Sequence, residues 1–354
     1  MNGFETDIRA QSALLRDLLT VNRQDDLLGR AAGLFSPGCP VVFTGMGSSL
    51  AAARPAAARV AAAGLWATAA EAGELLHYGL DTLRQGSLVV LVSQSGRSAE
   101  TVALGRRLRS TGGIRIIAVV NDLASPLAGL ADIVVPMHAG TEVTVSTKTF
   151  VATFVALNAL ADALIGISGE TVNLALGADL ASKLSLLAST PEIARASAVR
   201  FSSVQSLVVI GRGPAFSAAD YGALILKEAA AFAAEAMFAG SFRHGPIEIA
   251  GPATGVVVLA PPGQTQSLCV RLATDTARLG SPTWLLAGPD QGTPNGSRVD
   301  ALDGLVISDL PDIPEVLAPL LYCVPLQHLA VHLAVMRNRQ PGVVERSSKV
   351  TDSE

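Results

Sequence analysis

A run of small polar residues is the strongest chemical signal in the chain. Ser93-Gln94-Ser95-Gly96-Arg97-Ser98 follows the apolar segment 88–92 and precedes a segment with helical periodicity. Ligands of open α/β sheets bind where strands end, and the first N–H groups of a helix favour phosphate. Serine hydroxyls add donors at little steric cost. The pattern alone leaves two interpretations equally open: a phosphate-binding loop, or serines that only cap the helix.

A weaker version of this pattern occurs earlier, in Gly45-Met46-Gly47-Ser48-Ser49 after the apolar segment 41–43. A GxG after a strand usually permits a tight turn. Because Ser48, Ser49 and Leu50 follow Gly47, the segment is not a GxGxxG motif, and a dinucleotide site is poorly supported.

Two side chains are candidates for proton transfer. Glu228 ends the helical segment 221–228, which is rich in apolar residues. Burial there would raise the pKa of its carboxyl group, as a general base requires, although a solvated position is the commoner one for an acid. His244 lies in the turn-rich segment 242–246, where a histidine is a better catalytic candidate than on an apolar helix.

Metal binding has little support. His328 and His332 have helical i, i+4 spacing but lack the acid of an HExxH motif, so packing is the preferred interpretation. The three cysteines form no CxxC pair, which favours reduced thiols in the cytosol; they are Cys39, Cys269 and Cys323.

Composition excludes several classes of protein. Hydrophobic residues make up 49% and charged residues 16% of the 354 residues, which is typical of a globular chain and not of a disordered one. The net charge is −4 and no basic run occurs, so a nucleic-acid partner is not indicated.

No membrane or export segment is expected either. The longest apolar segment, 150–167, is interrupted by Asn158 and Asp162, which predicts a buried helix. The N-terminus lacks the basic-then-apolar pattern of a signal peptide. Together with the cysteines, these features predict a cytoplasmic protein.

Apolar strand segments alternate with helical segments along most of the chain, which predicts an α/β fold with parallel sheets covered on both faces. Strands are predicted at 41–43, 88–92, 114–120 and 133–135, and again at 207–210, 255–259 and 284–286. Gly45 and Gly47 recur 166 positions later as Gly211 and Gly213, which indicates one duplicated lobe. We expect a helical leader (1–35), a first lobe (36–170), a second lobe (196–336) and a C-terminal tail (337–354).

Several segments together resemble the sugar-isomerase (SIS) family. Ser93-Gln94-Ser95-Gly96 resembles its phosphate loop, and 139–150 resembles a second signature of the first lobe. The segments 211–213, 226–228, 234–236, 243–246 and 322–327 resemble signatures of the second lobe, and 341–351 resembles the tail. The similarity runs in order over nearly the whole chain. It is specific to the isomerase half of glutamine-dependent glucosamine-6-phosphate synthase and its standalone relatives: amino-sugar-phosphate deaminases, fructosamine-phosphate deglycases and ketose-phosphate isomerases.

The resemblance implies two tandem lobes of flavodoxin-like, three-layer form, and a role for each matching residue. Phosphate contacts would come from Ser93, Gln94, Ser95 and Ser98, with Ser49 nearby, and sugar contacts from Ser146. Catalytic roles would fall to three further residues. Glu228 would move a proton between C1 and C2, His244 would reach the site from the partner subunit of a homodimer and assist ring opening, and Lys349 would contact the carbonyl.

Three departures from the family pattern bear on activity. No glutaminase segment precedes the lobes, so glutamine hydrolysis is not expected. Tyr221 and Ile225 stand where the synthase carries an acid and a lysine, which indicates chemistry other than ordinary synthase isomerisation. Lys349 lies farther after Pro341 than the family's lysine does, so Arg346 is an alternative for its role.

The expected function is therefore a phosphosugar isomerase, deaminase or deglycase that needs neither metal nor organic cofactor, because Glu228 transfers the proton and the held phosphate orients the sugar. The alternative is a regulator that binds a sugar phosphate without turnover. The short leader before Phe43 leaves little room for a DNA-binding unit, which disfavours that alternative.

Overall fold

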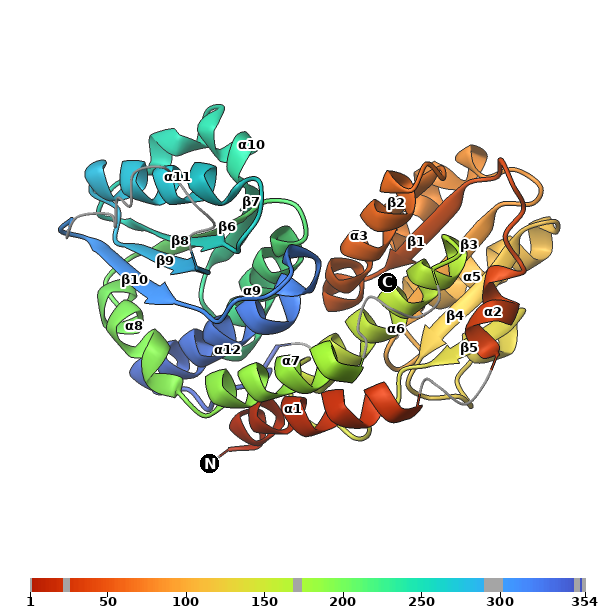
Figure 1. Ribbon diagram of the computed structural model, residues 1–354, viewed down its shortest axis with the longest axis horizontal. Coiled ribbons are helices and arrows are strands. Elements are labelled where there is room, and N and C mark those ends of the chain that lie inside the picture. The colour runs from red at the N-terminus through yellow and green to blue at the C-terminus, as the bar shows by residue number, and fades with distance from the viewer. Residues whose placement is uncertain (1, 22–25, 168–173, 290–301, 347–350, 352–354) are drawn as a thin grey trace. The chain divides into compact units, whose positions relative to one another are not determined.

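Ten strands form two parallel five-stranded sheets in the computed structural model, which describes residues 2–21, 26–167, 174–289, 302–346 and 351 (Figure 1). The first sheet has the order β2-β1-β3-β4-β5, and the second has the order β10-β9-β8-β6-β7. The first five strands are β1 (Val41–Gly45), β2 (Ala67–Glu71), β3 (Leu88–Ser93), β4 (Arg115–Val120) and β5 (Ile133–Pro136). The others are β6 (Ser206–Gly211), β7 (Ala234–Phe238), β8 (Thr254–Ala260), β9 (Thr283–Ala287) and β10 (Leu305–Asp309).

The two sheets have the same topology. β6 to β10 occupy the places that β1 to β5 occupy in the first sheet, and all registers are parallel. This confirms the predicted α/β fold of two tandem lobes. In each sheet the strand order reverses beside the first strand, between β1 and β3 and again between β6 and β8. Such a switch point is where open α/β sheets bind ligands.

Helices cover both faces of the first sheet. Alternate strand residues, among them Val89, Leu91 and Ile116, pack against α5 (Ala99–Thr111) and α4 (Ala72–Glu74). The opposite face is covered by α3 (Gly47–Ala62), which packs closely against α6 (Lys148–Leu164). Most residues that α3 buries are alanines, which allow a short distance between helices.

Most of the apolar segment 150–167 lies in α6 and is buried there, as its sequence predicts, whereas Ile167 lies beyond the end of the helix and is exposed. Its two polar residues are satisfied from α3. The Arg59 guanidinium forms an ion pair with Asp162 and donates to Asn158 Oδ1 at 3.2 Å. Since buried charges are tolerated only when paired, this contact explains why an apolar core helix carries an acid.

The second sheet is covered in the same manner (Figure 1). On one face, Val208, Val256 and Leu285 pack with α11 (Gln266–Arg278) and α10 (Ala239–Arg243). On the other face lies α9 (Ala215–Ala230), which packs against α12 (Ala318–Met336). Among the described helices, Glu315–Met336 is long and apolar enough to cross a membrane, but 89% of its apolar window is buried, as in a core helix.

The remaining described α-helices are α1 (Gly3–Val21), α2 (Leu27–Ala32), α7 (Leu174–Ala188) and α8 (Arg195–Phe201). Short helical turns of the 3₁₀ or π type lie at Leu75–Gly79, Leu80–Thr82, Ala128–Leu130, Pro191–Ala194, Pro246–Ile249 and Glu315–Leu317. The chain divides into two compact units. One contains residues 1–9 and 182–344, and the other contains 10–181 and 345–354. The end of the tail therefore groups with the first lobe.

Candidate active site

The loop after β3 is held in a fixed shape by its own serines. The hydroxyls of Ser93 and Ser98 lie 3.1 Å apart, and Ser93 Oγ accepts from Gly96 N at 3.1 Å. Gly96 has a positive φ of 62°, and a Cβ at this position would overlap the Ser125 hydroxyl. Only glycine fits such a position without strain. The loop thus has one conformation that brings two hydroxyls together at the start of α5.

Ser98 precedes α5 but does not cap it with its side chain, because its hydroxyl contacts Ser93 instead. The first N–H of the helix, Ala99 N, donates to the carbonyl oxygen of Thr351 at 2.9 Å. The hydroxyl of Ser95 accepts from Arg97 N at 3.2 Å within the loop. Helix capping by the Ser98 hydroxyl, one of the two interpretations left open by the sequence, is therefore not what the structure shows.

The loop after β1 emerges beside this one, at the switch point of the first sheet. Gly45 pairs with Val92 across the two strands, and a Cβ at Gly45 would lie 2.7 Å from the Val92 carbonyl oxygen. Ser49 follows in the first turn of α3 and is half-buried. The structure thus brings Ser49 and the 93–98 loop to neighbouring strand ends, as the parallel sheet predicts.

Asn121 joins a third segment to this edge of the sheet. Its backbone N–H donates to the Gln94 carbonyl at 3.0 Å, and its side chain bonds Ala139 N at 2.8 Å and Gly140 O at 2.9 Å. The segment 139–147, which carries Ser146, is thereby tied to the end of β4 beside the serine loop.

Glu142 is a site residue that sequence reasoning missed. This buried carboxylate accepts from Thr147 N and Oγ1 at 2.9 and 2.8 Å, and from Thr149 N and Oγ1 at 3.1 and 2.6 Å. It thus satisfies orphan N–H groups at the start of α6. Ser146 lies inside the loop that Glu142 closes, with its hydroxyl 2.9 Å from Thr149 Oγ1.

Replacing Glu142 with glutamine should destabilise the first lobe. An amide keeps one accepting oxygen but carries no charge, so the hydrogen bonds that Glu142 accepts lose their charge assistance, which costs about 1–3 kcal/mol. We expect Glu142→Gln to lower the free energy of unfolding by about that amount in chemical denaturation. Glu74→Gln, at an exposed carboxylate, should change it by no more than about 0.5 kcal/mol. Equal effects of the two substitutions would contradict this role.

Glu228 belongs to the other unit, in the last turn of α9, and is half-buried. Burial raises the pKa of its carboxyl group to about 7, partly opposed by the adjacent Lys227. Lys227 itself pairs with Glu235, with a nitrogen–oxygen distance of 3.4 Å. Among the described residues Glu228 has neither a hydrogen-bond partner nor a salt bridge, so its carboxyl group is able to exchange a proton near neutral pH.

Tyr221 and Ile225, the two α9 residues that depart from the family pattern, lie in the core. Tyr221 is fully buried, and its hydroxyl accepts from Gln327 on α12 at 2.9 Å. Ile225 is also fully buried. The positions where the synthase carries an acid and a lysine therefore hold packing residues in this chain.

Of the remaining candidate site residues, the structure describes His244 and Arg346 but not Lys349. His244 is exposed between α10 and the Pro246–Ile249 turn, and the neighbouring Arg243 pairs with Asp275 at 2.7 Å. Lys349 lies outside the described residues. Arg346, its alternative, is exposed. Within the described ranges, no group of three His, Cys, Asp or Glu residues is arranged to hold a metal ion.

Known proteins are similar to this chain in both sequence and fold. Residues 37–163 match the SIS domain. The isomerizing glutamine–fructose-6-phosphate aminotransferase of Pyrococcus horikoshii is 33% identical over 314 residues, which are 85% of this chain and 50% of the relative. The enzyme of that name from Escherichia coli is 31% identical over 267 residues, covering 73% and 43%. The chain thus spans about half the length of the curated relatives it matches.

Solved structures match the fold over nearly the whole chain. The C-terminal domain of glucosamine-fructose-6-phosphate aminotransferase from Francisella tularensis aligns with a TM-score of 0.81 at 22% identity, over 96% of this chain and 98% of that one. Glucosamine-6-phosphate deaminase from Thermotoga maritima aligns with a TM-score of 0.76 at 22% identity, over 99% of both chains. The chain is an SIS-domain protein that resembles the isomerase domain of the aminotransferases and the standalone phosphosugar isomerases and deaminases.

Proposed function

We propose that this protein is a sugar-phosphate enzyme that moves a proton between C1 and C2 of an open-chain hexose or amino-sugar phosphate. The observation that carries the proposal is the Glu228 carboxyl group, whose pKa is raised to about 7 by burial. A group with this pKa accepts and returns a proton at neutral pH, as an aldose–ketose isomerisation or a deamination requires.

The loop at 93–98 would hold the phosphate. Ser93 and Ser98 present a pair of hydroxyls 3.1 Å apart beside the N-terminus of α5. Hydroxyls, main-chain N–H groups and the helix dipole all favour a dianion at this point. With the phosphate held there, Gln94, Ser95, Ser49 and Ser146 would complete the contacts to substrate, and the fixed phosphate would orient the sugar carbons.

The tail would supply the last part of the site. The Thr351 carbonyl oxygen accepts from Ala99 N, so the end of the tail reaches the first turn of α5. We assign the carbonyl contact to Lys349, with Arg346 as the alternative. Neither a metal nor an organic cofactor is needed for this chemistry, and the proposed location is the cytoplasm.

Within this class, a reaction that releases an amine is favoured over ordinary synthase isomerisation. The positions equivalent to the synthase's acid and lysine hold Tyr221 and Ile225, both fully buried in the core of the second lobe. We therefore propose deamination or deglycation alongside isomerisation of a hexose phosphate.

An assay on a panel of phosphorylated sugars tests the proposal. Ammonia, ketose phosphate and aldose phosphate would be measured with glucosamine 6-phosphate, fructosamine 6-phosphate and fructose 6-phosphate, for the native chain and for Glu228→Gln. Turnover of at least one compound, lost in Glu228→Gln, is the expected result. Saturable binding without any turnover would support the second candidate function, a non-catalytic sugar-phosphate regulator.

We also propose a homodimer in which His244 serves the partner's site. His244 is exposed on its own unit, as a residue shared between subunits must be. If it acts across subunits, mixing the inactive variants Glu228→Gln and His244→Ala should restore activity. Random exchange gives one intact site in each mixed dimer, or about a quarter of the native activity. No recovery after subunit exchange, verified by mass-tagged chains, would contradict action across subunits.

A further inference from the structure

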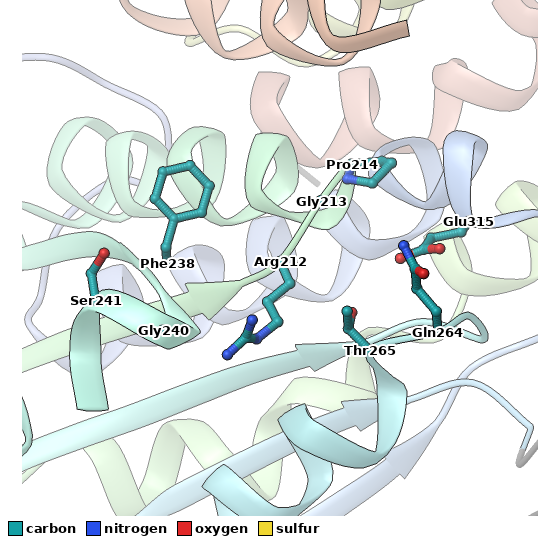
Figure 2. Close-up of a pocket in the computed structure, with 9 residues that line it drawn as sticks. All are labelled: Arg212, Gly213, Pro214, Phe238, Gly240, Ser241, Gln264, Thr265 and Glu315. Carbon is teal, nitrogen blue, oxygen red and sulfur yellow. The ribbon is translucent and has the colours of Figure 1, made fainter. Parts of the chain in front are cut away.

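A pocket lies at the switch point of the second sheet, in the place that the serine loop has in the first sheet. Its volume is about 360 Å³, within the range of small-molecule sites. Four parts of the lobe line it: the segments that follow β6 and β8, the end of β7 with the start of α10, and the Glu315 turn. The lining residues are Arg212, Gly213, Pro214, Phe238, Gly240, Ser241, Gln264, Thr265 and Glu315 (Figure 2). The pocket belongs to one lobe only, and none of its residues is among the proposed catalytic ones.

Arg212 supplies the positive charge of this pocket. Its Nε is buried without a hydrogen-bond partner, and within the described part of the chain its guanidinium forms no salt bridge. Figure 2 shows this side chain between Gly240 and Thr265. A Cβ at Gly240 would lie 3.6 Å from Arg212 Nη2, so the glycine leaves room beside the cation. An unpaired buried donor of this kind is costly unless a ligand satisfies it.

Other donors converge on the same space. The side chains of Ser241, Gln264 and Thr265 line the pocket and form no hydrogen bond with another described residue. Thr265 directly precedes α11, which has 13 residues, and Pro214 directly precedes α9, which has 16. The N-termini of both helices therefore lie at this edge of the sheet. A cation, neutral donors and two helix dipoles together favour an anionic group.

The opposite ends of the pocket indicate more than a bare anion. Glu315 lies with Gln264 at one end, away from Phe238 and Ser241 (Figure 2), and its carboxylate occupies the space over Gly263. A carboxylate accepts from vicinal hydroxyls, as sugars provide, but repels an inorganic anion. At the other end, the Phe238 ring stacks on Phe216 at 3.6 Å and is 45% exposed, which offers an apolar wall to a sugar face.

From these contacts we propose that the second lobe holds a second sugar-phosphate site, with Arg212 at the phosphate and Glu315 at the hydroxyls. Each chain then binds two sugar phosphates, one at the serine loop and one at Arg212. The second site depends on residues of its own lobe and does not require the first-lobe loop to bind phosphate. It provides the protein with a place for a sugar phosphate apart from Glu228.

Calorimetric titration of a chain with the first site disabled tests this proposal. Fructose 6-phosphate, glucose 6-phosphate and glucosamine 6-phosphate would be titrated into Ser93→Ala/Ser95→Ala/Ser98→Ala. We expect at least one of them to bind with a stoichiometry of about one per chain, and more tightly than inorganic phosphate. Absence of saturable binding of all three at 10 mM, a concentration of about ten times a weak millimolar Kd, overturns the proposal. Equal affinity for inorganic phosphate overturns the assignment of sugar contacts.

Substitutions in the same background assign the binding to this pocket. Arg212→Gln should weaken it at least about tenfold, since it removes a charge-assisted contact, whereas Arg278→Gln, at an exposed arginine of α11, should not. If Arg212→Gln fails to fold by circular dichroism, Gly240→Leu fills the pocket and leaves the cation in place. Binding that survives the folded variant unchanged places the ligand elsewhere and contradicts the inference.

Discussion

Glu228→Gln should lower turnover of the sugar phosphate by about 10²–10⁴-fold, the usual contribution of a positioned acid or base, while substrate affinity changes little. Glutamine keeps the size of the side chain but cannot take up a proton. In the native chain burial raises the pKa of this carboxyl group to about 7, so kcat/KM should rise as pH increases through that value and the base form accumulates. Steady-state kinetics from pH 5 to 9 would measure both effects.

The same substitution should stabilise the fold above neutral pH. Because burial raises the folded-state pKa of Glu228 from 4.5 to about 7, the stability contribution of this group is present below about pH 4.5 and is lost as pH rises through 7. Glutamine avoids that loss, which amounts to no more than about 3 kcal/mol. Glu235→Gln, at the exposed partner of Lys227, is the control and should leave the pH dependence of stability unchanged.

A Glu228→Gln variant with native turnover would contradict the assigned catalytic role.

Ser93→Ala/Ser98→Ala should weaken sugar-phosphate binding by about 10²-fold or more. Each hydroxyl is expected to donate to the phosphate, and a hydrogen bond to a charged group contributes about 1.5–3 kcal/mol. Isothermal titration with the best substrate of the panel would measure the loss. The effect should fall on the affinity for phosphorylated sugars, since the loop is expected to hold the phosphate and not the sugar ring.

Ser110→Ala supplies the matched control for this pair. Ser110 lies at the other end of α5 and is exposed, and its hydroxyl donates to the Arg107 carbonyl at 2.8 Å. Circular dichroism would verify that the double variant folds, because Ser93 Oγ also accepts from Gly96 N. If the folded double variant bound as many ligands per chain as Ser110→Ala, and as tightly, the phosphate would not lie in this loop.

The central strands of both sheets were predictable from sequence, and three edge strands were not. β1, β3, β4, β6, β8 and β9 are buried on both faces and have continuous apolar sequences. In contrast, β2, β7 and β10 are edge strands with half-exposed residues. β2 and β7 are rich in alanine, and β10 has only three consecutive apolar residues. Strand assignment there depends on pairing with a neighbour, a tertiary contact that periodicity does not contain.

The candidate site was predictable to the extent that it depends on local pattern. The serine loop sits at a strand end before a helix, so its place at the edge of the sheet followed from the sequence. Glu142 was not found because its four hydrogen bonds form only once the 139–147 loop closes on α6. Arg212 was not predicted to bind a ligand, although it lies inside the repeated Gly-x-Gly. Its buried Nε and its pocket arise only when four separate segments pack together.

Proton exchange at C1 and C2 tests the central claim most directly. The native chain would be incubated in D₂O with the panel of hexose and amino-sugar 6-phosphates, and the C1 and C2 positions followed by proton NMR. We predict that at least one bound compound incorporates deuterium at C1 or C2, and that Glu228→Gln abolishes the incorporation. Compounds that bind to the native chain yet retain every C1 and C2 proton would contradict an enzymatic role for Glu228.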